Sequence, residues 1–304
     1  MSEDTAASAF DVIVVGGSYA GMSAALQLAR ARRRVLVVDA GRRRNRFADT
    51  SHGFLGQDGV APDVIASVGK AQLLSYPSVT WVEGTARHAS RVDDGFEVHL
   101  EAGDRHIGKR LILAVGVTDE LPPIEGLPER WGRHVFHCPY CHGYELDGGR
   151  IGVLGVSAMS MHHALMLPDW GATTLFLNAA FEPTAEDLRA LNDRGVVLER
   201  SRVVRLSGDA TVELADGRHL AMDGLFTLSR TDVASPVAAQ LGCAFEEGPM
   251  GPFIRNDGVK QTSVEGVFAC GDAARMAGSV AFAVGDGALA GVSAHRSLMF
   301  GLQG

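Results

Sequence analysis

The chain has 304 residues, a formal net charge of −8 and 46% hydrophobic residues, so it is long enough for two domains with cores of their own. The mild acidic excess argues against a nucleic-acid partner. The polar start "MSEDTAASAF" has no basic segment followed by an apolar core, and no apolar run reaches the length of a membrane span. We therefore expect a soluble, cytoplasmic protein without a signal peptide.

The first forty residues predict a strand, a glycine-rich turn, a helix and a second strand. Residues 12–15 are a short β-branched run that is typical of a buried strand. Residues 21–32 carry apolar side chains at helical spacing, and residues 35–38 form a second apolar run that ends at Asp39. This order is that of a nucleotide-binding βαβ unit.

The turn after the first strand nearly matches G-x-G-x-x-G. Gly16 and Gly21 take the outer positions, and Ser18 takes the middle one. Serine is small enough for the backbone to approach a pyrophosphate, whose negative charge is attracted by the N–H groups at the helix start. Asp39 stands where an acid accepts hydrogen bonds from ribose hydroxyls. Together these features predict a dinucleotide site; the alternative is an ordinary α/β turn.

A second segment near the other end of the chain bears on which dinucleotide is bound. Residues 267–270 predict a buried strand, followed by Gly271, Asp272 and a helix of small residues from about Ser279. This segment, the first turn and "LILAVGVTDELPPIEGL" resemble the three FAD-binding stretches of flavoproteins with two dinucleotide-binding domains. The resemblance implies FAD as the cofactor, with Asp272 on its ribityl chain. The helix start near Ser279 would then stabilise negative charge on the reduced ring.

The same resemblance implies a wider set of cofactor-binding residues. They are Gly16, Gly17, Ser18, Tyr19, Ala20, Gly21, Asp39, Ala40, Arg46, Gln57, Ala86, Ala114, Gly116, Gly271, Asp272, Ser279 and Val280. The stretch "SHGFLGQDG" resembles the flavin-adjacent loop of these proteins, so we expect His52, Gly56, Gln57 and Asp58 to approach the ring. Ser279 stands where a reductase usually has glutamine.

An insertion is expected between the two FAD-like ends. Residues 151–154 and 174–177 predict two strands around a turn and a helix, and "ADGRHL" and "DDGFEVHLEAGDRH" carry hairpin signals. The sequence thus predicts an α/β fold class with two Rossmann-like, three-layer ββα dinucleotide-binding domains, the smaller inserted into a discontinuous FAD domain. The expected boundaries are 1–118 and 243–304 for the FAD domain, and 119–242 for the inserted domain with the redox C-x-x-C.

The inserted unit departs from a nicotinamide site at several positions. Its turn keeps only Gly155 of the three glycines, Ser157 and Ser160 take the later positions, and the second strand ends at Asn178 instead of an acid. The loop "LFLNAAFEPTAED" is neutral and then acidic, which repels the phosphates of NADPH. We therefore expect this domain not to bind NADPH productively; the alternative is a degenerate pocket that still binds it.

Two cysteines flank Pro-Tyr in "FHCPYCHGYEL", with His137 and His142 outside them. In a reducing compartment such a pair is typical of catalysis or metal binding. Zinc needs about four ligands and a second cysteine pair is missing, so we expect no metal. Cys-Pro-Tyr-Cys is also the active-site string of glutaredoxins, but these are much smaller and place the pair at a helix start. The remaining interpretation is a redox disulfide between Cys138 and Cys141 beside a flavin.

The position of this pair, just ahead of the second Rossmann-like unit, resembles the low-molecular-weight thioredoxin reductases. Those have an acidic residue after the second cysteine, whereas this chain has His142. With the broken NADPH pattern, that departure makes the chain more similar to the thioredoxin-reductase-like dithiol oxidases that close the disulfides of gliotoxin and holomycin. Their motif is likewise Cys-x-x-Cys-His-Gly. The resemblance covers essentially the whole chain and implies a homodimer.

This resemblance implies a dithiol oxidase whose substrate is a small-molecule dithiol or a thiol protein. A substrate thiolate attacks Cys138, which is expected to be the more exposed sulfur, and Cys141 leaves as a thiolate. We expect His142 to act as general base and acid and its imidazolium to stabilise that thiolate. His137 either assists or lies at the surface. The electrons pass to FAD and on to O2, the expected acceptor, giving hydrogen peroxide.

Two other functions stay open at this point. One is an NADPH-dependent disulfide reductase similar to thioredoxin reductase, and the other is a non-catalytic flavin redox sensor.

Of the side chains outside the motif, Cys243 and Cys270 lie in apolar surroundings and are expected to be buried. Adjacent helical histidines point about 100° apart, so we expect one of His162 and His163 to line the pocket and the other to face solvent.

Overall fold

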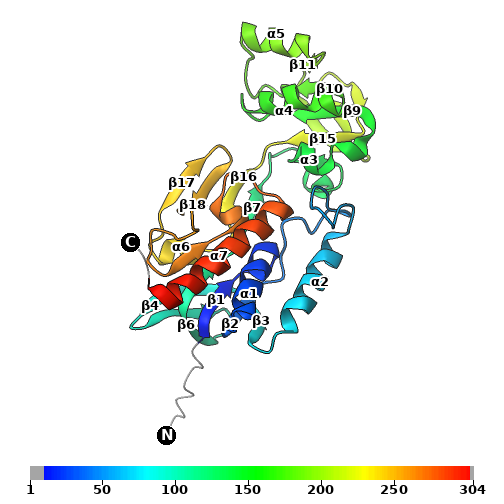
Figure 1. Cartoon of the computed structure of the whole chain (residues 1–304). Coiled ribbons are helices and arrows are strands. Elements are labelled where there is room, and N and C mark those ends of the chain that lie inside the picture. The colour runs from blue at the N-terminus through cyan, green and yellow to red at the C-terminus, as the bar shows by residue number, and fades with distance from the viewer. Residues whose placement is uncertain (1–9, 302–304) are drawn as a thin grey trace. The chain divides into compact units, whose positions relative to one another are not determined.

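The computed structural model describes residues 10–301 (Figure 1). Residues 1–9, on which the expected absence of a signal peptide rests, lie outside the described residues. The described chain forms two compact units. The first consists of residues 10–46, 62–118 and 231–301, and the second of residues 47–61 and 119–230.

The first unit is built on a sheet in the order β3-β2-β1-β6-β5-β4, with β19 paired to β6. Strand β1 pairs in parallel with β2 and β6, and β19 pairs in parallel with β6. The β1 side chains from Val12 to Val14 are fully buried, as in a strand covered on both faces. The strands are β1 (Phe10–Val15), β2 (Val35–Asp39), β3 (Val79–Glu83), β4 (Ala86–Val92), β5 (Gly95–Leu100), β6 (Arg105–Leu113) and β19 (Val267–Ala269).

Helices α1 (Tyr19–Arg30) and α7 (Val280–Phe300) pack side by side against this sheet (Figure 1). A Cβ atom at Gly287 would lie 2.0 Å from the carbonyl oxygen of Ala20, and one at Gly291 would lie 2.4 Å from that of Ala24. The two helices therefore approach so closely that only glycine fits on α7. The unit also contains α2 (Pro62–Leu74), α6 (Val237–Gln240), η4 (Gly271–Ala274), β17 (Phe245–Gly248) and β18 (Gly251–Ile254).

The second unit carries a parallel sheet in the order β11-β10-β9-β15-β8 and an antiparallel sheet in the order β12-β13-β14. The strands are β8 (Val135–Phe136), β9 (Gly148–Leu154), β10 (Gly171–Phe176), β11 (Val197–Glu199), β12 (Val203–Ser207), β13 (Thr211–Leu214), β14 (His219–Ala221) and β15 (Gly224–Thr227). The helices are η1 (Pro128–Arg130), α3 (Pro139–His142), η2 (Tyr144–Leu146), α4 (Ser160–Met166), η3 (Leu167–Asp169) and α5 (Ala185–Asp193).

The α/β fold class predicted from the sequence is confirmed, and so are both strand–turn–helix–strand units. The two hairpin signals correspond to β13–β14 and to the β4–β5–β6 meander. The buried positions expected for Cys243 and Cys270 are also found, with 6% and 0% of their surface exposed. Within residues 10–301, no helix combines the length and the apolarity needed to cross a bilayer.

The limits of the two units differ from the expected domain boundaries at two places. The sequence assigned residues 231–242 to the insertion, but Val237 and Ala238 belong to the core of the first unit. The sequence assigned residues 47–61 to the FAD domain, but Arg133 donates a hydrogen bond to the Phe47 carbonyl within the second unit. Two short strands pair with each other where the chain passes from one unit to the other. They are β7 (Val117–Glu120) and β16 (Arg230–Val233).

The contact between α1 and α7 predicts that Gly291→Ala lowers the free energy of unfolding by about 1–3 kcal/mol, because the new methyl group meets the Ala24 carbonyl oxygen. Gly285→Ala is the matched control on the same helix, since no described atom lies within 4 Å of its Cβ position. The control should gain about 0.5–1 kcal/mol from helix propensity. Urea unfolding measures both, and equal effects in the two variants would contradict this packing.

Candidate functional site

The turn between β1 and α1 allows only glycine at two of its positions. Gly16 has φ +103°, and a Cβ atom there would lie 2.2 Å from the carbonyl oxygen of Ala114. A Cβ atom at Gly21 would lie 1.7 Å from the carbonyl oxygen of Gly16. The fingerprint glycines are thus required by backbone contact within the turn, and Ser18 in the middle position is accommodated as the N-cap of α1.

The start of α1 is suited to an anion. The Ser18 side chain makes no capping hydrogen bond among the described residues, and no acidic residue occupies the first turn. The N–H groups there keep their partial positive charge for a phosphate. Asp39, the last residue of β2, accepts a hydrogen bond from the Gly17 N–H at 3.1 Å. The predicted acid therefore lies directly against the predicted phosphate turn.

A cavity of about 400 Å³ opens beside this turn. Asp39 and Ala40 line it as expected, and Lys70 and Trp81 line it from α2 and β3. The Trp81 Nε1–H is buried and has no hydrogen-bond partner in the described part of the chain, and the Lys70 ammonium lies 4.4 Å from the ring centroid. A donor, an acid and an aromatic face fit the nucleoside end of a dinucleotide. The sequence did not indicate Trp81 or Lys70, because only the sheet order places β3 beside β2.

The predicted ribityl-binding segment comes from late in the chain but lies against α1 in the same unit, since a Cβ atom at Gly271 would be 2.9 Å from the Cβ atom of Ala20. Gly271 adopts φ +71°, and the Asp272 carboxylate pairs with Arg44 at 3.0 Å. A Cβ atom at Gly278 would lie 2.1 Å from an Asp272 oxygen, so only glycine leaves room for the carboxylate at this position. Ser279 is the N-cap of α7 and accepts a hydrogen bond from the Phe282 N–H, which confirms the expected helix start.

The remaining predicted cofactor residues fall into two groups. Ala86 begins β4, Ala114 follows β6, Gly116 has φ +68°, Val280 begins α7, and Arg46 donates to the Arg43 carbonyl, all in the first unit. Gln57 and its neighbours His52, Gly56 and Asp58 belong instead to the second unit, together with the two cysteines of the motif. Their expected approach to the flavin stays a prediction.

Cys138 and Cys141 form a disulfide with their Cα atoms 5.3 Å apart. Cys138 is the N-cap of the one-turn helix α3, so the pair does stand at a helix start, and this feature does not separate the chain from glutaredoxins. Gly143 follows the helix and packs against the Trp170 ring, with its Cβ position 2.7 Å from that side chain. Cys138 and Cys141 are both partly buried. The greater exposure expected for the Cys138 sulfur therefore stays a prediction.

His142 directly follows the second cysteine and is partly buried. Its ring stacks on Phe136 with the centroids 4.3 Å apart. Burial lowers the pKa of His142 to about 4, with a smaller contribution from His52. In the disulfide form the imidazole is therefore neutral at physiological pH, which suits a proton acceptor. An imidazolium, as the sequence suggested for the thiolate partner, forms only once a proton has been taken up.

A second shielded imidazole lies behind the motif. The His163 side chain on α4 is 4% exposed. Its pKa is lowered to about 4, mainly by burial and to a smaller extent by the charge of His162. A hydrogen bond between His163 and the backbone of His137 raises this pKa and so opposes the effect of burial. His162 is exposed, as expected for one of this pair. His137 itself is partly buried with its ring 5.9 Å from Trp131, so its backbone, one residue before Cys138, is held by His163.

In the second nucleotide-like turn, polar groups that a nucleotide would need already make hydrogen bonds within the chain. The Ser160 hydroxyl accepts a hydrogen bond from the Val156 N–H at 3.1 Å, which takes one donor that a phosphate would use. Asn178, after β10, accepts one from the Val203 N–H at 3.0 Å and thus serves the chain's own backbone. Arg200 pairs with both oxygens of Glu182, the first of three acids in the loop "LFLNAAFEPTAED", at 2.9 and 3.0 Å.

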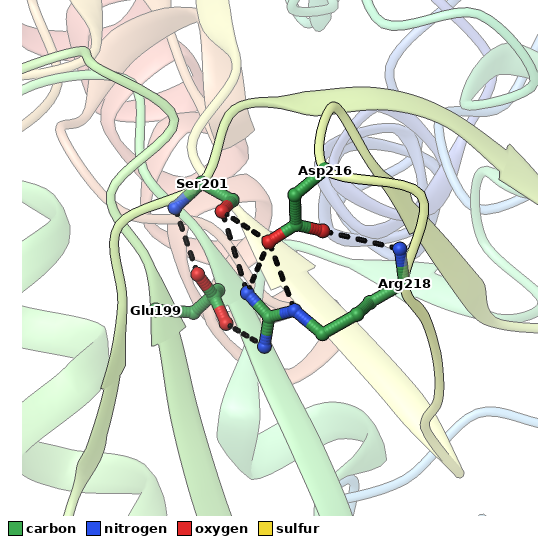
Figure 2. Close-up of polar contacts among 4 residues, drawn as sticks. All are labelled: Glu199, Ser201, Asp216 and Arg218. Atoms are coloured by element: carbon green, nitrogen blue, oxygen red, sulfur yellow. Dashed lines mark hydrogen bonds and ion pairs between the residues drawn. The ribbon is translucent and has the colours of Figure 1, made fainter.

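A further network binds the arginine of the β13–β14 hairpin. Figure 2 shows the Arg218 guanidinium between the carboxylates of Glu199 and Asp216, with Ser201 bonded to both acids. Hydrogen bonds from Arg218 and then Ser201 hold the pKa of Asp216 well below its usual range. The positive charges of Arg200 and Arg218 are therefore matched by carboxylates of the same unit.

Comparison with known proteins agrees with this architecture. The model of the pyridine nucleotide-disulphide oxidoreductase family matches residues 10–287. Thioredoxin reductase tcpT of Claviceps purpurea is 34% identical over 318 residues, covering 97% of this chain and 96% of that protein. The crystal structure of an oxidoreductase from Agrobacterium tumefaciens shares 58% identity with a TM-score of 0.94, over 96% of this chain and 99% of the other.

A second solved structure, that of HlmI, shares 37% identity with a TM-score of 0.89, over 96% of this chain and 93% of the other. The predicted resemblance to thioredoxin-reductase-like oxidoreductases of the gliotoxin and holomycin type is thereby confirmed. Proteins of this kind are FAD-binding flavoproteins, which confirms the expected cofactor. The uncapped helix start, Asp39 and the orphan Trp81 N–H fit the nucleotide part of FAD.

The two shielded histidines predict a loss of stability in acid. Their folded-state pKa values lie below the ordinary value of 6.5, so between pH 6.5 and 4 the unfolded chain binds protons that the folded chain does not. Stability is therefore full above pH 6.5 and falls as the pH drops towards 4, by at most about 1.4 kcal/mol per pH unit for each histidine.

Urea unfolding at pH 7, 6 and 5 measures this loss. His163→Gln removes the titrating group, so the variant should lose about 1–2 kcal/mol less than the wild type between pH 7 and 5. His162→Gln is the matched control, because the His162 side chain is exposed. If His163→Gln keeps the slope of the wild type, the shielded imidazole is not its source.

Proposed function

This chain belongs to the pyridine nucleotide-disulphide oxidoreductase family, and we propose that within it the protein is a dithiol oxidase. A dithiol substrate reduces the Cys138–Cys141 disulfide, the electrons pass to FAD, and O2 takes them up as hydrogen peroxide. The coarser statement, that the chain is a thioredoxin-reductase-like disulfide oxidoreductase, follows from the matches alone. The proposal adds the direction of electron flow and the acceptor.

The observation that carries the proposal is the neutral, shielded imidazole of His142 beside the disulfide. Oxidation of a dithiol requires a group that takes a proton from the incoming thiol, because the thiolate is the nucleophile in disulfide exchange. A histidine that is already protonated cannot do this. With its pKa lowered to about 4, His142 is largely unprotonated near neutral pH, and its ring stacks on Phe136.

The chain's own residues account for the first bond changes. The substrate S–H bond breaks and its proton moves to the His142 imidazole, while the sulfur bonds to Cys138. The Cys138–Cys141 bond breaks, and its electron pair stays on Cys141 as a thiolate. This new negative charge beside His142 favours the protonated ring, so the proton affinity of the base rises in the same step.

The second substrate thiol completes the exchange. Its sulfur attacks the mixed disulfide and closes the substrate disulfide, while its proton passes to the released Cys138 sulfur. Bound FAD would supply the redox chemistry that connects the reduced cysteines with O2. The α1 start, Asp39 and Asp272 are the residues that would hold it. Per turnover one dithiol loses two protons and two electrons, and one O2 gains them.

The second nucleotide-like turn supports an oxidase over a reductase. Ser160, Asn178 and Glu182 make hydrogen bonds or ion pairs within the chain at positions where a nicotinamide nucleotide would need free donors or cations. Arg200 is matched by Glu182, and Arg218 is matched by Glu199 and Asp216 (Figure 2). An electron source other than NADPH is consistent with this arrangement, and the substrate dithiol supplies it.

The alternative is an NADPH-dependent disulfide reductase that acts on thioredoxin or another thiol protein. It is favoured by one observation, the name thioredoxin reductase carried by relatives such as tcpT. A non-catalytic flavin sensor is a weaker alternative, because it leaves the disulfide and His142 without a use. The choice between a small dithiol and a thiol protein as substrate, the homodimer and the cytoplasmic location stay predictions.

Anaerobic titration of the yellow protein separates the oxidase from the reductase. We expect dithiothreitol to bleach the flavin absorbance, whereas equimolar NADPH or NADH leaves it unchanged within the same time. In air, the dithiol should consume O2 and produce an equal amount of hydrogen peroxide. Rapid bleaching by NADPH would establish the reductase instead, and no bleaching by any of the three reagents would favour the sensor.

Removal of either sulfur should stop electron transfer without removing the flavin. Cys138→Ser and Cys141→Ser should each lower the rate of anaerobic bleaching by dithiothreitol by at least about 100-fold, because no exchangeable disulfide remains. Cys243→Ser is the matched control, since this thiol is buried and far along the chain in the core of the other unit. Bleaching at the wild-type rate in both active-site variants would sink the proposal.

A further inference from the structure

Two segments of the second unit adjoin the disulfide. The motif segment, residues 136–147, contains both cysteines together with α3 and η2, which pack against each other. The second segment is the loop of residues 47–61, which an antiparallel bridge between Ser51 and Val60 closes. The His52 Nε2 lies 3.3 Å from Glu145 Oε1, so the loop contacts the motif segment. The two segments therefore form one continuous surface next to the redox cysteines.

This surface carries the most exposed apolar side chains of the described chain. Within residues 10–301, Leu55, Tyr144 and Tyr140 are 97%, 85% and 74% exposed, and no other large hydrophobic side chain exceeds 68%. Tyr140 stands between the two cysteines in the chain, and its ring meets that of Trp170 edge-on, with the centroids 5.4 Å apart. Exposed apolar groups that gather in one place are typical of a binding surface.

The same two segments are acidic. They contain no lysine or arginine and four carboxylates, which belong to Asp49, Asp58, Glu145 and Asp147. All four of these residues are exposed. Their net charge stays negative even with His52 protonated between Glu145 and Asp58. The Arg133 guanidinium contacts the loop at its first residue, where it donates to the Phe47 carbonyl. A negative potential therefore surrounds the approach to the disulfide.

The two properties select between dithiols in different ways. Apolar and aromatic side chains gain free energy when the hydrocarbon part of a substrate covers them. Carboxylates that need not touch the substrate repel any anion that approaches, which slows its association and lowers its affinity. Because Cys138 and Cys141 are partly buried, the attacking sulfur has to pass these side chains, which suits a small molecule better than a protein surface.

We propose that this surface selects a small dithiol that has an apolar body and carries no negative charge. The inference rests on the proposed dithiol oxidase function and names the substrate class of the same disulfide. Tyr140 and Tyr144 bind the apolar body, while the four carboxylates disfavour anionic thiols. The bond changes stay those of the exchange at Cys138 and Cys141, in which the dithiol loses two protons and two electrons.

A pair of dithiols that differ by one charge tests the selection. Dihydrolipoamide and dihydrolipoate share the dithiol and the hydrocarbon chain, but only the second carries a carboxylate. At low ionic strength the second-order rate constant of anaerobic flavin bleaching should be at least about tenfold larger for the amide. The preference should shrink in about 0.5 M salt, because salt screens exposed charges. Reduced thioredoxin, at the same thiol concentration, should react more slowly than the amide.

Removal of two of the acids tests the source of the preference. In the double variant Glu145→Gln, Asp147→Asn, the ratio of the two rate constants should fall at least about threefold, because two repelling charges are lost. The matched control is Glu186→Gln, Asp193→Asn, which removes the same charge from exposed positions on α5. Helix α5 lies well apart from α3 in the same unit (Figure 1), so this control should keep the wild-type ratio.

Tyr140→Ala tests the apolar contact. The dihydrolipoamide concentration that gives half the limiting bleaching rate should rise about fivefold, since an aromatic contact is worth this much. The effect on dithiothreitol, which has no hydrocarbon chain, should be smaller. Tyr140→Phe keeps the ring and should match the wild type. Each variant is first compared with the wild type for flavin content and melting temperature.

The outcomes separate this inference from the function beneath it. If dithiothreitol does not bleach the wild-type flavin, the oxidase proposal falls and the selection with it. If it does, but the two lipoyl dithiols react equally fast or reduced thioredoxin outpaces the amide, the inference alone is overturned. An unchanged ratio in the acid variant, or equal losses with both dithiols in Tyr140→Ala, also overturns it. A salt-sensitive preference that the acid variant alone reduces supports it.

Discussion

Backbone contact without intervening side chains is the constraint on which the first unit depends. The turn after β1 brings Gly16 against Ala114, and α7 lies on α1 through Gly287 and Gly291. Because these elements touch directly, the start of α1 keeps one position above the sheet. Its uncapped N–H groups, Asp39 and the cavity beside Trp81 then form a site for the nucleotide part of FAD.

The second unit uses the same strand–turn–helix–strand arrangement for a different purpose. Its turn satisfies one of its own donors through Ser160, its second strand ends at an asparagine that binds the backbone, and Arg200 and Arg218 are paired with acids. The fold of a nucleotide-binding unit is thus retained while its polar groups are directed inward. What this unit offers for chemistry is the disulfide and the shielded histidine after it.

Shielding has opposite consequences for taking a proton and for releasing it. Burial keeps His142 neutral, so it can accept a proton, but the same burial separates it from water. The loop of residues 47–61 contacts the segment that follows the motif, since the His52 Nε2 lies 3.3 Å from Glu145 Oε1.

The amino-acid sequence by itself determined the two βαβ units, the FAD fingerprint and the redox cysteine pair, because glycine spacing, buried apolar runs and Cys-x-x-Cys-His are local patterns. It indicated Gly16, Asp39, Cys138, Cys141 and His142 on that basis. Only the tertiary structure placed Trp81 beside Asp39, His52 beside Glu145, and His163 behind His137, since these pairs meet through sheet order and loop packing. The neutral state of His142 was likewise decided by burial, which depends on neighbours that are far apart in the chain.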